Sequence, residues 1–315
     1  MTTNILTDAE QALFNNLPGP PVEAIIRTTN IWIIEWLPSG DPRTGKHLHE
    51  WMQSQRPGWP AYFKCESKHD VLSAIEHATD LAQNSRMSPV LHFEAHGNED
   101  GLGRQYNNGH VEFLEWNEIT KSLQKLNLVT RCNLVVVVAA CIGFAGIKAL
   151  VQGPRAPAVA LVGPDASIIS DNLLSAMREF YSCWMDPDPR FRDIVISASH
   201  VTGETSFEWE PFPVLAFDSL AELLIVSMRE DQQRIQINRI RKRILEETEL
   251  SSTEIECRLS KLTPSLQATF FQHLWDTMFM IDLYPENSER FGVNWTEIVD
   301  MALQKNRHEM VEKGT

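Results

Sequence analysis

The sequence predicts an α/β protein in which a mostly parallel sheet is flanked by helices and followed by a helical C-terminal part. Strand-like and helix-like stretches alternate from residue 24 to about residue 217. Residues 135–138 are four consecutive valines, which favour a strand buried on both faces, as in parallel sheets. Beyond about Asp218 only helical periodicity remains. We therefore expect an N-terminal segment (1–23), an α/β domain (24–217) and a helical docking or regulatory region (218–315).

The individual elements follow from apolar periodicity and from turn residues. Helices are expected to begin near Asp8, Ser67, Asn117, Ile147 and Ser170. Strands are expected at 24–37, 89–95, 111–114, 134–140 and 156–162, with further candidates at 194–197 and 214–217. Residues 38–62 are rich in proline and glycine, which predicts a long irregular connection, and residues 97–103 predict a glycine-rich loop.

Two other interpretations compete for the valine-rich stretch 134–147. As a membrane-spanning helix it would reach only about 21 Å, which is short of the ~30 Å hydrocarbon core of a bilayer. As an ordinary core strand it would carry Cys141 as an inert thiol, which is how most free cysteines behave. The small residues that follow Cys141 predict a sharp strand-to-helix corner with the thiol at its apex.

Composition restricts the classes of partner. The formal net charge of −14 over 315 residues argues against a general nucleic-acid or anionic-membrane surface. Five scattered cysteines without metal-finger spacing predict free thiols in a reducing compartment. No apolar leader opens the sequence and no histidine pattern predicts a metal site. We expect a cytoplasmic protein without metal or cofactor and with no direct nucleic-acid or membrane partner.

Two predicted strands end in residues that can carry out chemistry. One ends in His96-Gly97 and the other in Ala140-Cys141, and 45 residues separate the histidine from the cysteine. A connection of this length can place the strands side by side, and active sites of parallel sheets lie beyond the carboxyl ends of strands. We therefore expect His96 and Cys141 to face one crevice.

This order of strand endings resembles the caspase-like (clan CD) cysteine peptidases, in which the histidine precedes the cysteine by about 50 residues. Leu91-His92-Phe93-Glu94-Ala95-His96-Gly97 is similar to the histidine strand of the prokaryotic caspase-like and CHAT-type branch. The stretch from Cys141 to Gly146 is similar to the glycine-rich helix start of that branch, although the glutamine of the caspase pentapeptide is missing. The resemblance covers about residues 24–217 and implies a caspase-like fold.

The resemblance implies roles that the residue chemistry supports. A thiolate is a strong nucleophile, and a nearby imidazole can accept its proton and later protonate the leaving amine. Cys141 is thus the expected nucleophile and His96 the expected general acid and base. The backbone N–H groups of Gly97 and Cys141 are the expected oxyanion donors. The other cysteines (Cys65, Cys132, Cys183 and Cys257) are expected to be structural, and His92 is expected to be packed in the core.

Three carboxylates are candidates for contacting the substrate. Asp165 follows the next strand, where relatives often shape the first specificity pocket, and an acidic residue there favours Arg or Lys before the scissile bond. A simple turn-forming role after Gly163-Pro164 is the competing interpretation of Asp165. Glu94 and Asp100 are the other candidates.

The hypothesis is a prokaryotic cysteine endopeptidase that cleaves a protein partner, more readily after a basic residue. The resemblance further implies antiviral defence or programmed death, with an associated sensor as activator. The first alternative is a non-catalytic caspase-like scaffold that binds protein partners. The second is a different α/β hydrolase or a nucleotide-binding domain, but the chain has no G-x-S-x-G, no Walker loop and no G-x-G-x-x-G that opens a helix.

Overall fold

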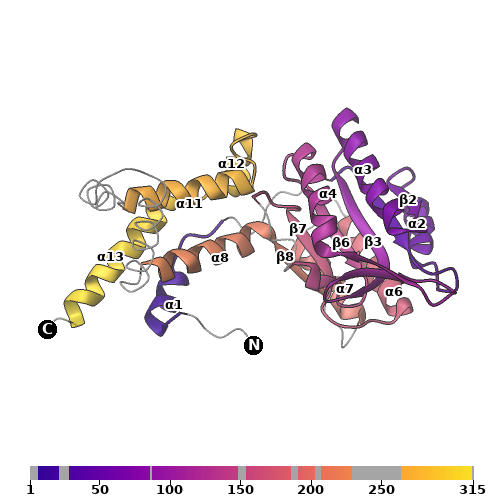
Figure 1. The fold of residues 1–315 in the computed structure, drawn as a ribbon, viewed down its shortest axis with the longest axis horizontal. Helices are drawn as coiled ribbons and strands as arrows, with labels where there is room; N and C mark the ends of the chain where they lie inside the picture. Colours follow the sequence, from indigo (N-terminus) through magenta and orange to yellow (C-terminus); the bar gives the residue numbers. More distant parts are fainter. Residues whose placement is uncertain are drawn as a thin grey trace, which may run out of the picture. The chain divides into compact units, whose positions relative to one another are not determined.

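The fold was determined as a computed structural model, shown in Figure 1. It describes residues 6–20, 28–85, 87–147, 154–185, 191–202, 207–228 and 264–313. By their contacts these residues form two compact units, an α/β unit (21–213 with 278–290) and a helical unit (1–20, 214–277 and 291–315). The predicted boundaries at residues 23 and 217 stay predictions.

The elements of the chain, in order within each class, have the following bounds. The strands are β1 (Asn30–Trp36), β2 (Pro60–Lys64), β3 (Pro89–Asn98), β4 (Gly101–Gln105), β5 (Val111–Glu115), β6 (Val135–Ala139), β7 (Ala160–Pro164) and β8 (Phe207–Pro211). The α-helices are α1 (Asp8–Phe14), α2 (Thr44–Gln55), α3 (Lys68–Ser85), α4 (Trp116–Val129), α6 (Ser170–Trp184), α7 (Phe191–Thr202), α8 (Phe212–Ser227), α11 (Pro264–Met278), α12 (Ser288–Phe291) and α13 (Trp295–Lys313). Two 3₁₀ turns are η1 (Gly143–Gly146) and η2 (Pro285–Asn287).

The α/β unit is built on a mostly parallel sheet with the strand order β2-β1-β3-β6-β7-β8. Strands β2, β1, β3, β6 and β7 run parallel, and β8 pairs antiparallel with β7. The carboxyl end of β3 extends beyond its pairing with β1 and β6 and pairs antiparallel with β4, which in turn pairs antiparallel with β5. The predicted α/β class, with helices on both sides of a mostly parallel sheet, is confirmed.

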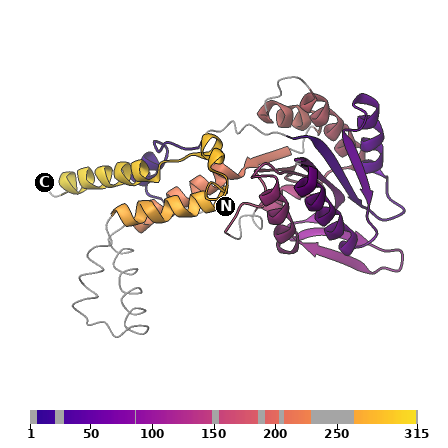
Figure 2. The same ribbon diagram turned by 90° about the horizontal axis from the view of Figure 1, so that it is seen from above.

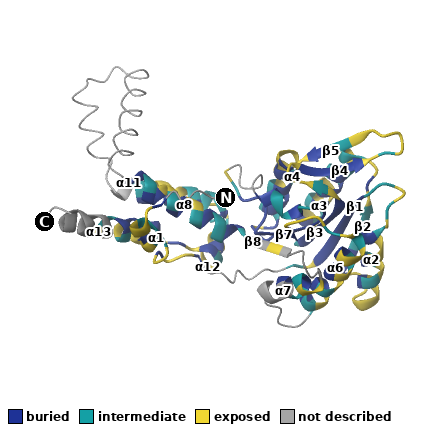
Figure 3. Ribbon diagram, turned by 90° about the horizontal axis from the view of Figure 1, so that it is seen from below, coloured by how far each residue is buried: buried dark blue, intermediate teal, exposed yellow. Residues whose placement is uncertain are grey.

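Helices cover both faces of the sheet. Helices α2, α6 and α7 lie on one face and α3 and α4 on the other, as Figures 1 and 2 show together. The central strands of the sheet are mostly buried (Figure 3), and every residue of β6 is at most 1% exposed. The four valines therefore form the centre of the core, as β-branched side chains do between two helical layers. Within the described ranges, no helix combines the length and apolar character needed to cross a membrane.

The helical unit has an aromatic core of its own. Trp275 of α11 and Trp295 of α13 are fully buried, and the indole N–H of Trp275 donates to the carbonyl of Phe291 at 2.7 Å. Phe271 stacks on Trp295 with 5.2 Å between ring centroids. At the start of α1 the Thr7 hydroxyl and the Glu10 carboxylate cap each other's backbone N–H groups, as their spacing predicts.

Several predicted elements differ from the observed ones. The connection 38–62 contains α2 and the start of β2, because Leu48 and Met52 give α2 a buried face that the turn residues concealed. The glycine-rich stretch 97–103 belongs to the β3–β4 hairpin. Residues 194–197 lie in α7 and residues 214–217 in α8, so these two strand predictions are wrong. The helix predicted to follow Cys141 is described only as far as η1 and Ile147.

Candidate active site

His96 and Cys141 lie near the carboxyl ends of two neighbouring parallel strands. The pairing of β3 with β6 ends at Glu94 and Ala139; His96 lies two residues further along β3, and Cys141 lies two residues beyond Ala139, in the turn after β6. Adjacent strands are about 4.8 Å apart, and residues two apart point to the same face. The carboxyl ends of β3 and β6 therefore bring the two candidate residues to one edge of the sheet.

Gly97 fills the narrow space between the two strand ends. A Cβ atom at this position would lie 2.7 Å from the carbonyl oxygen of Cys141 and 2.9 Å from the Cβ of Ala140. Real Cβ atoms essentially never approach backbone oxygen this closely, so only glycine fits without a shift. The glycine that follows the histidine thus allows the two chemistry-bearing ends to approach each other.

The imidazole of His96 has a carboxylate partner that the sequence analysis missed. His96 Nε2 lies 2.6 Å from Oδ2 of Asp41, and the two side chains are 56% and 33% exposed. Asp41 belongs to the loop after β1, which is the other neighbour of β3. An ionised carboxylate at Nε2 holds the proton on that nitrogen and leaves Nδ1 unprotonated as an acceptor. The sequence does contain a clue to this pairing, because Asp41 is the first acidic residue after the end of β1, a strand adjacent to β3.

The thiol of Cys141 sits at a strained corner. The next residue, Ile142, has φ = 54°, which is unfavourable for a β-branched side chain. The N–H groups of Ile142 and Gly143 donate to Ala166 and Ala140 at 3.0 Å each. Among the described residues, the N–H of Cys141 itself has no hydrogen-bond partner, and it remains available to bind an incoming oxygen.

The thiol and the imidazole are not hydrogen-bonded to each other in the described part of the chain. The thiol of Cys141 donates instead to the carbonyl oxygen of Ile168, with 3.8 Å between sulfur and oxygen. The segment between β7 and α6 therefore runs along the corner after Cys141, since it also supplies Ala166. Asp165 lies in this segment with an exposed side chain.

The three candidate substrate carboxylates lie in different environments. Asp165 is exposed beside the Cys141 corner, and Asp100 is exposed at the tip of the β3–β4 hairpin, where its N–H donates to Asn98 at 2.8 Å. Glu94 is only 1% exposed, and its oxygens bind Thr44 at 2.7 Å and His92 at 3.0 Å. This placement corrects the expectation for Glu94, whose carboxylate has no surface to offer a substrate.

His92 and Glu94 belong to a buried polar chain beneath α2 and α6. The other ring nitrogen of His92 lies 2.9 Å from the hydroxyl of Tyr181, and His92 is fully buried, as predicted. Burial, together with the charge of Glu94, raises the pKa of Tyr181 well above its usual value. The phenol therefore stays protonated, and its hydrogen bond with the imidazole ties β3 to α6 just before His96.

The remaining described cysteines differ from Cys141. Cys65, Cys132, Cys141 and Cys183 are all free thiols, and Cys257 lies outside the described residues. Burial raises the pKa of Cys65 and that of Cys132 to about 12. Cys183 is half-buried and lies 3.4 Å from the hydroxyl of Ser197. No group of three or more potential metal ligands occurs among the described residues.

The comparisons with known proteins give matches among solved structures. No protein-family model and no curated protein matches the chain. Among solved structures it is similar to RgpB from Porphyromonas gingivalis, in a complex of pro- and mature domains, with 10% identity and a TM-score of 0.36 over 65% of this chain and 53% of that chain. It is also similar to Raptor from Chaetomium thermophilum, with 12% identity and a TM-score of 0.31 over 56% of this chain and 22% of that chain.

The chain thus spans about half the length of the first structure and about a fifth of the second. Likenesses at this level leave the chemistry of the site to be argued from its own residues.

Proposed function

We propose that this protein is a cysteine endopeptidase with a caspase-like arrangement of His96 and Cys141. The observation that carries the proposal is the register of β3 and β6, which brings both residues to one sheet edge with Gly97 packed between them. The carboxylate of Asp41 on His96 adds the orienting group that a histidine base needs. In this proposal the three groups act together beyond the carboxyl ends of β1, β3 and β6, where parallel sheets carry their active sites.

The mechanism follows from the hydrogen bonds. With Asp41 at Nε2, the Nδ1 atom of His96 accepts the thiol proton, and the thiolate of Cys141 attacks the carbonyl carbon of the scissile peptide bond. The N–H groups of Gly97 and Cys141 donate to the oxyanion. Collapse of the intermediate breaks the C–N bond, and the imidazolium gives its proton to the leaving amine. Water, deprotonated by His96, then hydrolyses the thioester and restores the thiol.

The substrate in this proposal is a protein cleaved after Arg or Lys. Asp165 is the exposed carboxylate beside the Cys141 corner, and ion pairing with a basic side chain would place the following peptide bond over the thiol. The resemblance of the sequence adds a role in prokaryotic defence, with a sensor protein as activator. The expectation of a basic residue is tested by Asp165→Asn. This variant should reduce cleavage after Arg and Lys and leave the residue preferences at the other positions of the peptide unchanged.

A non-catalytic scaffold is the second candidate. The observation that favours it is the hydrogen bond of the Cys141 thiol to Ile168, which leaves the thiol and the imidazole unconnected. In the peptidase, binding of the substrate would have to turn the thiol from Ile168 toward His96. Apo active sites often tighten in this way only when substrate binds.

A peptide library cleaved by the wild type, by Cys141→Ala and by His96→Ala tests the proposal. Cleavage should be lost in both variants and retained in Cys183→Ala, which removes a half-buried thiol elsewhere in the α/β unit. Circular dichroism of each variant checks that the fold is kept. Cleavage that survives in Cys141→Ala would refute the peptidase, and a folded wild type that cleaves no peptide would favour the scaffold.

A further inference from the structure

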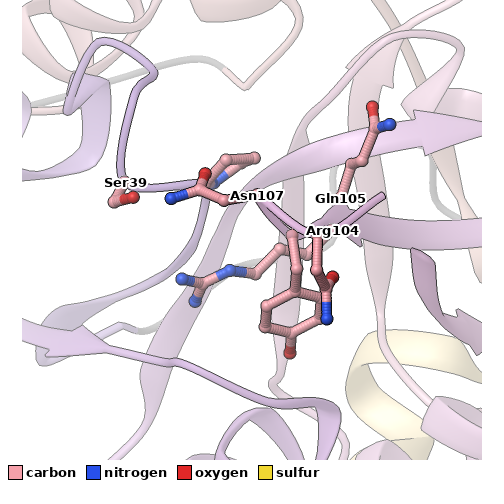
Figure 4. Close-up of a pocket in the computed structure, with 7 residues that line it drawn as sticks. Ser39, Arg104, Gln105 and Asn107 are labelled. Atoms are coloured by element: carbon pink, nitrogen blue, oxygen red, sulfur yellow. The ribbon is translucent and has the colours of Figure 1, made fainter. Parts of the chain in front are cut away.

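A recess in the surface lies between the loop after β1 and the end of β4. We call it the amide pocket. It has a volume of about 330 Å³ and is lined by Pro38 and Ser39 from the loop after β1 and by residues 104–108 at the end of β4 and in the following turn (Figure 4). This volume is at the lower end of the range for ligand sites and matches one or two residues of a peptide.

Both walls of the amide pocket continue into the elements that hold the imidazole. His96 pairs with Gly103, the residue immediately before Arg104. Asp41, which binds His96, follows Ser39 by two residues, and its N–H donates to the carbonyl of Pro38 at 3.2 Å. A polypeptide that lies across His96 from Cys141 would therefore extend toward this pocket.

Two of the three guanidinium nitrogens of Arg104 already have partners. Its side chain is 6% exposed, and its Nη1 and Nη2 atoms donate to the carbonyl of Cys65 at 2.8 Å and to the carboxylate of Glu66 at 2.5 Å. The guanidinium also lies 5.1 Å from the ring centroid of Tyr106. Arg104 thus supports the floor of the pocket as a cation paired with Glu66, and its buried Nε is the one guanidinium nitrogen without a hydrogen-bond partner among the described residues.

The open polar groups of the pocket are uncharged. In Figure 4 the carboxamide of Asn107 extends toward Ser39 above the guanidinium of Arg104, whereas Gln105 extends to the other side. Both Ser39 and Asn107 are exposed, and among the described residues neither side chain has a hydrogen-bond partner. A carboxamide offers a donor and an acceptor together, and the hydroxyl can serve as either.

The nature of the lining selects the occupant. A carboxylate would meet a guanidinium already paired with Glu66, in a protein of net charge −14. A basic group would find no carboxylate in the lining, and an apolar group would leave the polar groups of Ser39 and Asn107 desolvated. A second carboxamide pairs with Asn107 through two hydrogen bonds.

We propose that the amide pocket is a specificity subsite that takes an asparagine or glutamine side chain of the substrate, at a position other than the residue that binds Asp165. This inference rests on the proposed peptidase function, because it makes the pocket part of the same substrate-binding surface.

The test compares peptides that carry Gln or Asn with peptides that carry the isosteric Met or Leu at each position around the cleaved bond. The wild type should prefer the amide about tenfold in kcat/KM at one position. Asn107→Leu should abolish this preference without changing the preference for Arg or Lys. Asn107→Asp should shift the preference at that position toward Lys. Asn84→Leu on α3 is the matched control, because it makes the same change at an exposed position away from the pocket.

The outcomes separate the two proposals. Cleavage without an amide preference at any position overturns the amide pocket and leaves the peptidase intact. If the wild type cleaves nothing, the same peptides are tested for binding to Cys141→Ala by fluorescence anisotropy. Amide-dependent binding that Asn107→Leu weakens about tenfold and Asn84→Leu leaves unchanged then supports the pocket, and binding without this dependence overturns it.

Discussion

At the scale of single residues, His96 and His92 both contact a carboxylate, but His92 is fully buried whereas His96, which lies 2.6 Å from Asp41, is 56% exposed. The contact with Asp41 positions the His96 ring and selects the tautomer in which Nδ1 can accept a proton. Asp41 touches neither the thiol nor the peptide bond of the mechanism above, so it acts as a positioning residue through the imidazole.

We predict that Asp41→Asn lowers kcat about 10- to 100-fold with little change in KM, because an amide can hold the ring in the unproductive tautomer. The split between kcat and KM is the decisive readout, since loss of the carboxylate should impair proton transfer by the ring and leave substrate binding unchanged. Asp80→Asn, an exposed position on α3, serves as the control. An unchanged kcat in Asp41→Asn, or a loss confined to KM, would contradict a positioning role for this carboxylate.

The thiols of the chain should differ in reactivity. At pH 8 iodoacetamide should modify Cys141 and leave Cys65 and Cys132 unmodified in the native protein, because burial raises the pKa of both buried thiols to about 12. Mass spectrometry of the digested protein measures the extent of alkylation at each cysteine. Modification of Cys132 at the rate of Cys141 would show that the α/β core opens readily.

At the scale of elements, the site depends on how closely the ends of β3 and β6 approach. The register places Glu94 opposite Ala139, and Gly97 keeps the contact tight. The short 3₁₀ turn η1 then directs the chain away from the sheet edge, because Gly143 and Gly163 are packed against each other and against Val138 without room for side chains.

We predict that Gly97→Ala destabilises the α/β unit by about 1–3 kcal/mol, because its methyl group would press on Cys141 and Ala140. The free energy of unfolding from urea titration measures this, and peptidase activity should fall with it. Gly19→Ala is the control, since its Cβ would lie 3.7 Å from Phe217, an ordinary contact. Equal stability of the two variants would show that the strand ends are further apart than described.

At the scale of the whole molecule, buried acidic groups with a raised pKa make the free energy of unfolding fall at alkaline pH. Burial, with the charge of Glu35, raises the pKa of Tyr62 to about 12. Burial also raises the pKa of the Cys65 thiol and that of the Cys132 thiol to about 12. Unfolding returns these groups to their usual values of about 8.5 for thiols and 10 for tyrosine. The stability they contribute is therefore complete below pH ~8.5 and is lost as pH rises toward ~12.

The urea midpoint should accordingly fall between pH 9 and about pH 11, because the unfolded state releases protons that the folded state retains. Tyr62→Phe should be less stable near pH 8, through loss of its hydrogen bond to Glu35 at 3.0 Å, and its midpoint should fall less steeply between pH 9 and pH 11. Equal slopes for Tyr62→Phe and the wild type would contradict the raised pKa of this phenol.

The sequence by itself determined the α/β class, the buried valine strand and the positions of His96 and Cys141 at strand ends, because burial and strand periodicity are local properties of the chain. It did not determine α2 within 38–62, the burial of Glu94 or the partnership of Asp41 with His96. These depend on which strands become neighbours. The parallel order β1-β3-β6 brings together side chains that lie 55 and 45 residues apart in the sequence, a choice made only when the core packs.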